Sequence, residues 1–105
     1  MTNPAVALTA LADPTRRAIF ERLARSPSAV GDLAREFPVS RPAVSQHLKV
    51  LKSAGLVTDQ AAGTRRVYSV DAAGVAAVRE YFEQFWQQSL ASFRTAASQP
   101  IQEET

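Results

Sequence analysis

One segment of this chain constrains its fold and function more than any other. Residues 39–57 read VSRPAVSQHLKVLKSAGLV. At about 100° per residue, this spacing predicts a helix with Val44, Leu48 and Leu51 on one apolar face. The opposite face is short, polar and basic, and it carries no carboxylate: Arg41, Pro42, Ser45, Gln46, Lys49 and Lys52. One face is therefore expected to anchor the helix, and the other to contact a partner.

The chemistry of the polar face fits the major groove of DNA. Serine and glutamine side chains hydrogen-bond base edges, and lysine or arginine neutralises phosphates. We expect Ser45 and Gln46 to read bases, and Lys49 and Lys52 to hold phosphates. A helix face that only meets solvent usually mixes both signs of charge.

The flanking residues predict a helix-turn-helix. Ser40 is a good N-cap and, with Arg41, would set the entry of the helix, while Gly55 suits the left-handed position that ends it. Residues 28–37 have apolar side chains at helical spacing and are predicted to form the preceding helix. Only the three residues 38–40 separate the two predicted helices, and so short a connection indicates a helix-turn-helix.

A β-hairpin is predicted directly after this unit. Residues 56–60 and 65–70 have strand character and flank the turn sequence Ala-Ala-Gly-Thr. Such a hairpin is the wing of a winged helix. Arg65 and Arg66 open its second strand, and we expect at least one of them to contact phosphate or the minor groove.

Other basic residues have less specific interpretations. His47 lies at the border of the apolar face, about 40° from Leu51, and is interpreted as a packed or phosphate-adjacent structural residue rather than a base reader or a metal ligand. Arg16 and Arg17 either contact the DNA backbone or pair with Glu21 on a solvent face.

Charge is distributed unevenly. Residues 1–70 carry ten Lys or Arg against five Asp or Glu, whereas residues 71–105 carry two against five. A local basic excess is typical of nucleic-acid binding. The chain has no cysteine, no long apolar run and no signal-peptide pattern, so we expect a cytoplasmic protein without a membrane span. No motif of an enzyme occurs, and no cofactor is expected.

The rest of the chain completes a mainly helical fold. Asn3-Pro4 and Asp13-Pro14 are predicted to start two helices that end near residues 12 and 25. A long final helix is predicted from Asp71 to about residue 97. The predicted order is α-α-α-α-β-β-α, with one winged helix-turn-helix domain over residues 1–97 and a flexible tail over residues 98–105.

The final helix carries an apolar stripe rich in aromatic residues. At a length of about 39 Å it exceeds what a core this small can cover, so part of the stripe should meet another chain. Val75 and Val78, near the wing, are expected to pack within the chain. The remainder of the stripe is expected to form a dimer interface: Phe82, Phe85, Trp86, Ser89, Leu90 and Phe93. A small-molecule effector pocket between these aromatics is the alternative.

Four motifs together resemble one protein family. They are LADPTRRAI at residues 11–19, VGDLA at 30–34, SRPAVSQHLKVL at 40–51 and GTRRVY at 63–68. In order and spacing they resemble the ArsR/SmtB family of bacterial winged-helix repressors. The resemblance implies a homodimer built from the first and last helices, which adds Leu8 to the expected interface, and binding to an inverted-repeat operator in double-stranded DNA.

The chain departs from the metal-sensing members of that family. Those proteins carry thiolates near the start of the third helix, where this chain has Ala-Val-Gly-Asp at 29–32, or His and carboxylate pairs on the last helix. One histidine and no cysteine do not supply a site of three or four soft ligands. The chain therefore resembles the metal-independent branch, and no metal site is expected.

The sequence thus predicts a DNA-binding transcriptional regulator, most simply a repressor. Two alternatives remain at this level. One is a sensor of the same fold that binds a small molecule at the aromatic helix. The other is a winged-helix module that uses the same face to bind protein.

Overall fold

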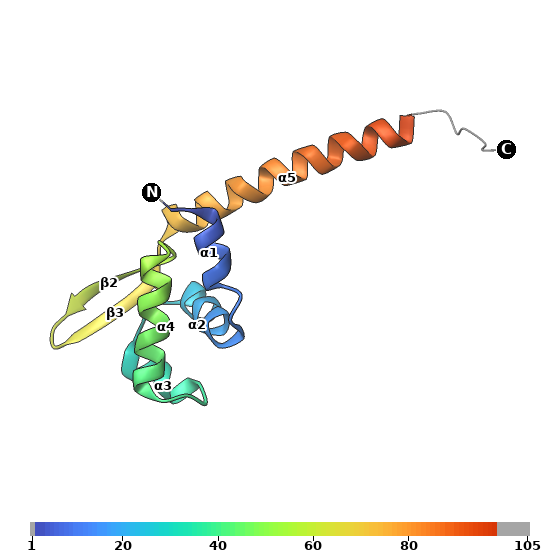
Figure 1. Ribbon diagram of the computed structural model, residues 1–105. Coiled ribbons are helices and arrows are strands. Elements are labelled where there is room, and N and C mark those ends of the chain that lie inside the picture. The colour runs from blue at the N-terminus through green and yellow to red at the C-terminus, as the bar shows by residue number, and fades with distance from the viewer. Residues whose placement is uncertain (1, 99–105) are drawn as a thin grey trace.

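The computed structural model describes residues 2–98, and it begins with two helices that each start at a capping residue followed by proline (Figure 1). In α1 (Pro4–Ala10) the Asn3 side chain accepts a hydrogen bond from the backbone N–H of Ala5. In α2 (Pro14–Arg25) Asp13 accepts from the N–H of Arg16 at 2.8 Å. Both predicted helix starts are therefore confirmed. Each cap stabilises its helix because it satisfies a backbone donor that the first turn leaves unpaired.

The helix-turn-helix consists of α3 (Val30–Glu36) and α4 (Arg41–Ser53). The Ser40 hydroxyl caps α4 by accepting from the N–H of Ala43 at 3.2 Å. After the end of α4, Gly55 has φ of 79°, the left-handed conformation that glycine adopts without strain. Both predicted ends of the α4 segment are therefore confirmed.

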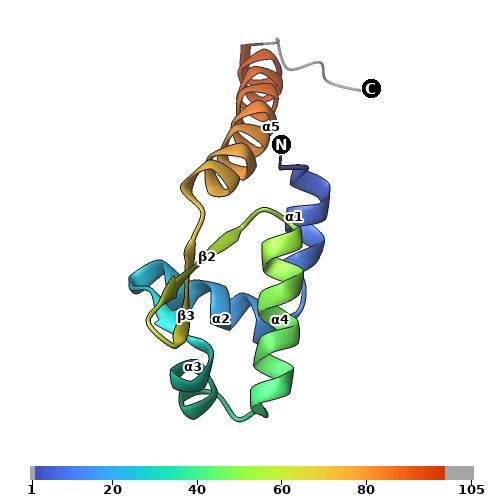
Figure 2. The ribbon, with the colours of Figure 1, turned by 90° about the vertical axis from the view of Figure 1, so that its left-hand side faces the viewer.

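A three-stranded antiparallel sheet forms the wing and its base (Figure 2). The predicted hairpin is present as β2 (Val57–Ala62) and β3 (Arg65–Val70). A third strand, β1 (Ser28–Ala29), pairs with β3 on the other side, giving the order β1-β3-β2.

The prediction of helix from residue 28 is wrong for its first two residues. Ser28 pairs with Tyr68 and Ala29 with Val67, so both residues belong to the sheet. A two-residue strand is too short to show an alternating pattern. Its conformation is set by the hydrogen-bonding edge of β3, about 40 positions later in the chain, which local spacing cannot reveal.

The hydrophobic core lies between α4 and the other helices. Val44, Leu48 and Leu51 are each 0% exposed, which confirms the apolar face predicted for α4. The remaining large, fully buried side chains come from α2, α3 and the start of the wing: Ile19, Leu23, Leu33 and Leu56. Burial of one whole face of α4 holds the opposite face outward.

The last helix, α5 (Ala72–Ser98), extends well beyond the rest of the fold (Figure 1). Its first turns contact α1, and Val78 packs against the edge of the core. Val75 is 37% exposed, so the prediction that both valines pack within the chain is wrong for Val75. Apart from Ser98, which ends α5, the predicted tail lies outside the described residues. Among the helices of residues 2–98, none combines the length and apolar character needed to cross a membrane.

The start of α5 is joined to the end of α4 by a close backbone contact. A Cβ atom added to Gly74 would lie 1.8 Å from the carbonyl oxygen of Gly55. The backbone N–H of Asp71 also donates to the carbonyl of Leu56 at 2.9 Å. Because only a hydrogen atom fits at Gly74, this contact fixes where α5 leaves the domain.

Two helical glycines should therefore respond oppositely to alanine. Gly74→Ala should lower the free energy of unfolding by about 1–3 kcal/mol, because the added methyl group forces backbone atoms apart. Gly31→Ala is the matched control, because the new Cβ would lie 3.8 Å from the nearest guanidinium nitrogen of Arg41, an ordinary van der Waals distance. That change should raise stability by roughly 0.5–1 kcal/mol. Urea unfolding measures both, and equal effects would contradict the close contact.

Candidate nucleic-acid interface

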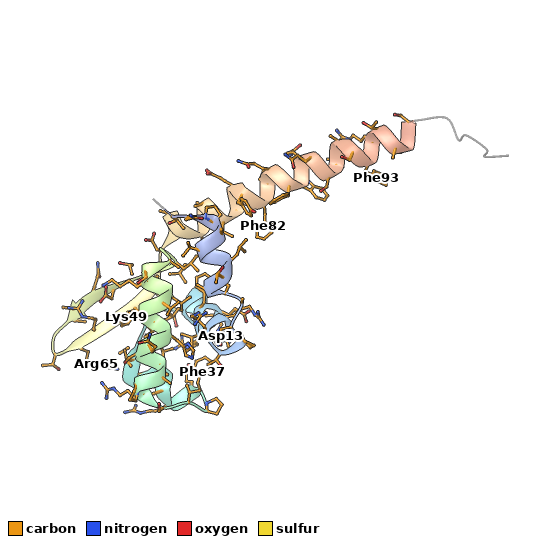
Figure 3. The ribbon with its side chains drawn as sticks, in the orientation of Figure 1. Asp13, Phe37, Lys49, Arg65, Phe82 and Phe93 are labelled. Carbon is orange, nitrogen blue, oxygen red and sulfur yellow. The ribbon has the colours of Figure 1, made fainter. Side chains whose placement is uncertain are left out.

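The outer face of α4 is open along its whole length. Its six predicted contact residues are all exposed: Arg41, Pro42, Ser45, Gln46, Lys49 and Lys52. Ser40 is exposed at the start of the helix as well. Figure 3 shows Lys49 on this helix, and Arg65 lies nearby at the wing. The structure thus brings the residues predicted on the helix and on the wing to one side of the molecule.

Lys52 of this face forms an ion pair with a carboxylate of the wing. Its Nζ lies 2.8 Å from one carboxylate oxygen of Asp59 in β2, and Arg66 in β3 lies 2.9 Å from the other oxygen. The Asp59 side chain is only 7% exposed. Hydrogen bonds from Lys52 and Arg66 hold the pKa of Asp59 below its ordinary value, although burial opposes them. Asp59 therefore stays ionised near neutral pH and joins the wing to α4.

A second carboxylate joins the wing to α3. Asp32 accepts a hydrogen bond from Arg65 and forms a weaker ion pair with Arg35 at 3.3 Å. The bond from Arg65 lowers the pKa of Asp32, and the nearby positive charges of Arg65 and Arg35 add to this effect. The two wing arginines therefore bind carboxylates on different elements: Arg65 binds Asp32 of α3, and Arg66 binds Asp59 of β2.

Sequence reasoning missed both carboxylates. The face of α4 itself has none, as its sequence shows, but Asp59 approaches it from the wing. Asp59 is seven residues from Lys52 in the chain, and Asp32 is 33 residues from Arg65. The alternation of β2 and the turn length would have placed Asp59 near the base of the wing, but its partner on the helix depends on how the hairpin packs.

A basic cleft of about 440 Å³ lies between the wing, α3 and the start of α4. Four arginines line it: Arg35, Arg41, Arg65 and Arg66. Asp32 is the carboxylate among its described lining residues. Arg65 and Arg66 each keep guanidinium N–H groups beyond those in the ion pairs, since the group has five donors. Four cations around one carboxylate leave a net positive hollow that can accept a phosphate.

Three residues with open interpretations are now placed. His47 is half-buried, and its Nδ1 is buried without a hydrogen-bond partner in residues 2–98. Arg16 and Arg17 donate to the carbonyls of Ala10 and Leu11 at the end of α1. Neither arginine forms an ion pair with Glu21 within residues 2–98, so the alternative that pairs them is wrong. Both instead satisfy carbonyl groups that a helix end leaves open.

The aromatic stripe of α5 is exposed on the single chain. Phe82, Phe85, Trp86 and Phe93 are 52%, 48%, 59% and 69% exposed. Tyr81 packs edge-on against Phe85, with ring centres 4.9 Å apart. The other residues predicted at an interface are exposed, as is Ser89, or half-buried, as are Leu8 and Leu90. Figure 3 shows Phe82 and Phe93 well separated along the projecting helix.

Metal ligands do not gather in the part of the chain that the structure describes: residues 2–98 contain no group of three or more His, Cys, Asp or Glu side chains able to hold an ion.

Comparisons with known proteins agree with this arrangement. A helix-turn-helix domain family matches residues 11–60. The chain is 62% identical to the HTH-type transcriptional regulator Rv2034 of Mycobacterium tuberculosis over 87% of this chain and 85% of that protein. It is 39% identical to the transcriptional repressor SdpR of Bacillus subtilis over 59% of this chain and 69% of that protein.

A solved structure supports the same assignment. An ArsR-like transcriptional regulator from Rhodococcus sp. RHA1 matches with a TM-score of 0.77 and 30% identity, over 92% of this chain and 94% of that one. The chain belongs to the ArsR/SmtB family. It is a DNA-binding transcriptional regulator, and the family is one of regulators rather than enzymes.

Neutralising Asp59 should strengthen binding to DNA of any sequence. Asp59→Asn removes the carboxylate that Lys52 and Arg66 share, so both cations become free to release counterions from DNA. The slope of log K against log salt should steepen by roughly 1–2 for two copies on one duplex. Fluorescence anisotropy with a random duplex measures the slope.

The matched control for this change is Glu21→Gln. It alters net charge equally but removes an exposed carboxylate on α2 that forms no ion pair within residues 2–98. An Asp59→Asn slope no steeper than that of Glu21→Gln would show that Asp59 does not restrain the two cations.

Proposed function

We propose that this protein is a homodimeric repressor that binds an inverted-repeat operator through α4 and the wing. The observation that carries the proposal is the fully exposed polar face of α4 beside a cleft lined by four arginines. An α-helix fits the major groove of B-DNA, and a basic hairpin beside it reaches the flanking backbone or the minor groove. Because its ligand is chromosomal DNA, we place the protein in the cytoplasm.

The residues of this surface divide into two roles. Ser45 and Gln46 lie midway along α4 and carry no charge, so we assign them to base edges. Ser40 and Arg41 set the entry of the helix at the phosphates, beside Pro42. Lys49 contacts a phosphate without competition from a carboxylate within residues 2–98.

Lys52, Arg65 and Arg66 hold phosphates while they are also bonded to carboxylates of the chain. Each ion pair restrains a long side chain before DNA binds. The N–H donors that remain free are therefore held in a fixed geometry toward the DNA. The cost is a smaller net positive charge on the surface. These residues therefore contribute orientation more than affinity.

The second copy of the chain is proposed to pack on the aromatic stripe of α5, with Leu8 of α1 at its edge. Exposed aromatic side chains that follow one helix face are typical of an interface core. A dimer would place two α4 helices for successive turns of the major groove, about 34 Å apart. A dimer on an operator within a promoter blocks access to that DNA, which is the simplest means of repression.

Two substitutions on α4 test the assigned roles. Selection from random duplex DNA should first enrich an inverted repeat. On that site Gln46→Ala should weaken the free energy of binding by on the order of 1–3 kcal/mol and relax the base preference at one position of each half-site. Lys49→Ala is the control from the same exposed face, and it should weaken all sequences alike. Binding profiles with these two effects exchanged would reverse the assignment, and failure to enrich any sequence would refute specific recognition.

A charge in the aromatic stripe should separate the two chains. Phe85→Glu would bury an unpaired carboxylate in each protomer at the proposed interface, at a cost of several kcal/mol. We expect a folded monomer whose operator affinity falls toward the non-specific level, although no DNA-facing residue has changed. Light scattering measures the mass in solution, circular dichroism measures the fold, and operator titration measures the affinity.

The control for that variant is Gln84→Glu, which adds the same charge to an exposed position outside the stripe. It should remain dimeric. A Phe85→Glu protein that stays dimeric with unchanged operator affinity would remove α5 from the interface. If Phe85→Glu loses its fold, Trp86→Ala, which shortens a 59% exposed side chain, gives the same comparison without a buried charge.

A further inference from the structure

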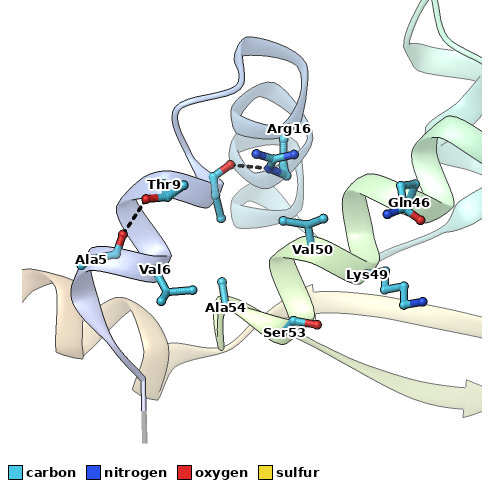
Figure 4. A pocket seen from close by; sticks show the side chains of 10 residues that line it. Ala5, Val6, Thr9, Arg16, Gln46, Lys49, Val50, Ser53 and Ala54 are labelled. Carbon is cyan, nitrogen blue, oxygen red and sulfur yellow. Dashed lines mark hydrogen bonds between the residues drawn. The ribbon is translucent and has the colours of Figure 1, made fainter.

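A groove of about 450 Å³ lies between α1 and α4, outside the aromatic stripe and the basic cleft (Figure 4). Its apolar floor includes Val6 of α1 and Val50 and Ala54 of α4. Val6 is 49% exposed, so a large apolar side chain stands open to solvent at this place. The volume lies in the range of small-molecule sites, which are mostly apolar with a few polar groups.

The polar lining of this groove is cationic. Arg16 and Lys49 both line it, and no carboxylate is among its described lining residues. Neither side chain takes part in an ion pair within residues 2–98. The Nε of Arg16 donates to the carbonyl of Ala10, which fixes the guanidinium at the groove while its other N–H groups stay available. Lys49 has a flexible stem that lets its ammonium group approach from the facing helix.

The groove also shares residues with the proposed DNA surface. Gln46 and Lys49 line the groove and are the residues proposed to contact a base and a phosphate. Figure 4 shows both on α4, across the groove from Val6 and Thr9 of α1. An occupant of the groove therefore competes with DNA for these two side chains.

We propose that this groove binds a small amphipathic carboxylate, and that the ligand weakens operator binding. The apolar tail lies on Val6, Val50 and Ala54, and the carboxylate lies between Arg16 and Lys49. A carboxylate there draws Lys49 away from phosphate and adds a negative charge beside the DNA. The regulatory part of this inference rests on the proposed function, whereas the ligand site does not.

The site is distinct from the proposed dimer interface. Leu8, the interface residue of α1, is two positions from Val6 and so lies about 200° around the helix. A second copy seated on Leu8 and the aromatic stripe leaves the Val6 side of α1 open. The same dimer can therefore hold one ligand in each protomer.

Ligand binding is tested first on the full chain without DNA. Isothermal titration with octanoate, 1-octanol and octylammonium compares one apolar tail under three head-group charges. We expect octanoate to bind with one site per protomer and at least about tenfold more tightly than the other two, because a charge-assisted hydrogen bond contributes that much. Equal affinity for all three, or no binding of octanoate, would overturn the site.

Val6→Glu locates the site by placing a carboxylate on its floor. Because Val6 is half exposed, the change should not disturb the core, and octanoate affinity should fall at least about tenfold. Val75→Glu is the matched control, since Val75 is a 37% exposed valine on α5 that does not line the groove. It should bind octanoate as the unchanged chain does. A Val6→Glu protein with undiminished affinity would move the site elsewhere, the aromatic stripe included.

Operator titration then tests the coupling. Saturating octanoate should weaken operator binding by about tenfold or more, and the operator should weaken octanoate binding by the same factor. The effect should be lost in Val6→Glu and kept in Val75→Glu. Unchanged operator affinity at saturation would overturn the regulatory inference. If no operator is found at all, the proposed function fails, while the titrations without DNA still decide whether the site exists.

Discussion

The contact between the backbones of Gly55 and Gly74 is the constraint on which the arrangement of this protein depends. Gly55 follows the DNA-facing helix α4, and Gly74 lies in the first turn of the projecting helix α5. Any side chain at Gly74 would collide with the Gly55 carbonyl, and the hydrogen bond from the N–H of Asp71 to the carbonyl of Leu56 closes the base of the hairpin that lies between the two glycines in the chain. The direction of α5 is thus fixed relative to α4. In a dimer formed through α5, this junction would set the separation of the two reading helices.

The wing is held by ion pairs that also reduce the charge available to DNA. Asp59 and Asp32 each bind a wing arginine, and Asp59 binds Lys52 of α4 as well. Removing both carboxylates would give a more positive surface, but the hairpin would lose its attachment to α3 and α4. A regulator must prefer one site over a large excess of other DNA, so a restrained surface with modest charge favours discrimination over total affinity.

Sequence predicted the features that depend on neighbouring residues. The two faces of α4, the caps at Asn3, Asp13 and Ser40, and the turn at Gly55 all follow from local spacing, and the structure confirms them. What it could not predict depends on packing between distant segments: the pairing of β1 with β3, the pairs made by the two carboxylates, and the groove between α1 and α4. The exposure of Val75 belongs to the same class, because periodicity identifies an apolar face but not whether another element covers it.

The short helix α1 is the element through which the groove and the projecting helix are related. It has seven residues, too few to be stable alone, and it is held by its cap at Asn3 and by Arg16 and Arg17, which bind its last carbonyls. It contacts both α4 and α5. A carboxylate drawn to Arg16 would contact the residue that holds the end of α1, the helix between the DNA-facing and the aromatic surfaces. Because Arg16 keeps its bond to Ala10 while its other N–H groups bind the carboxylate, α1 stays in place, and competition for Lys49 is the step that would weaken DNA binding.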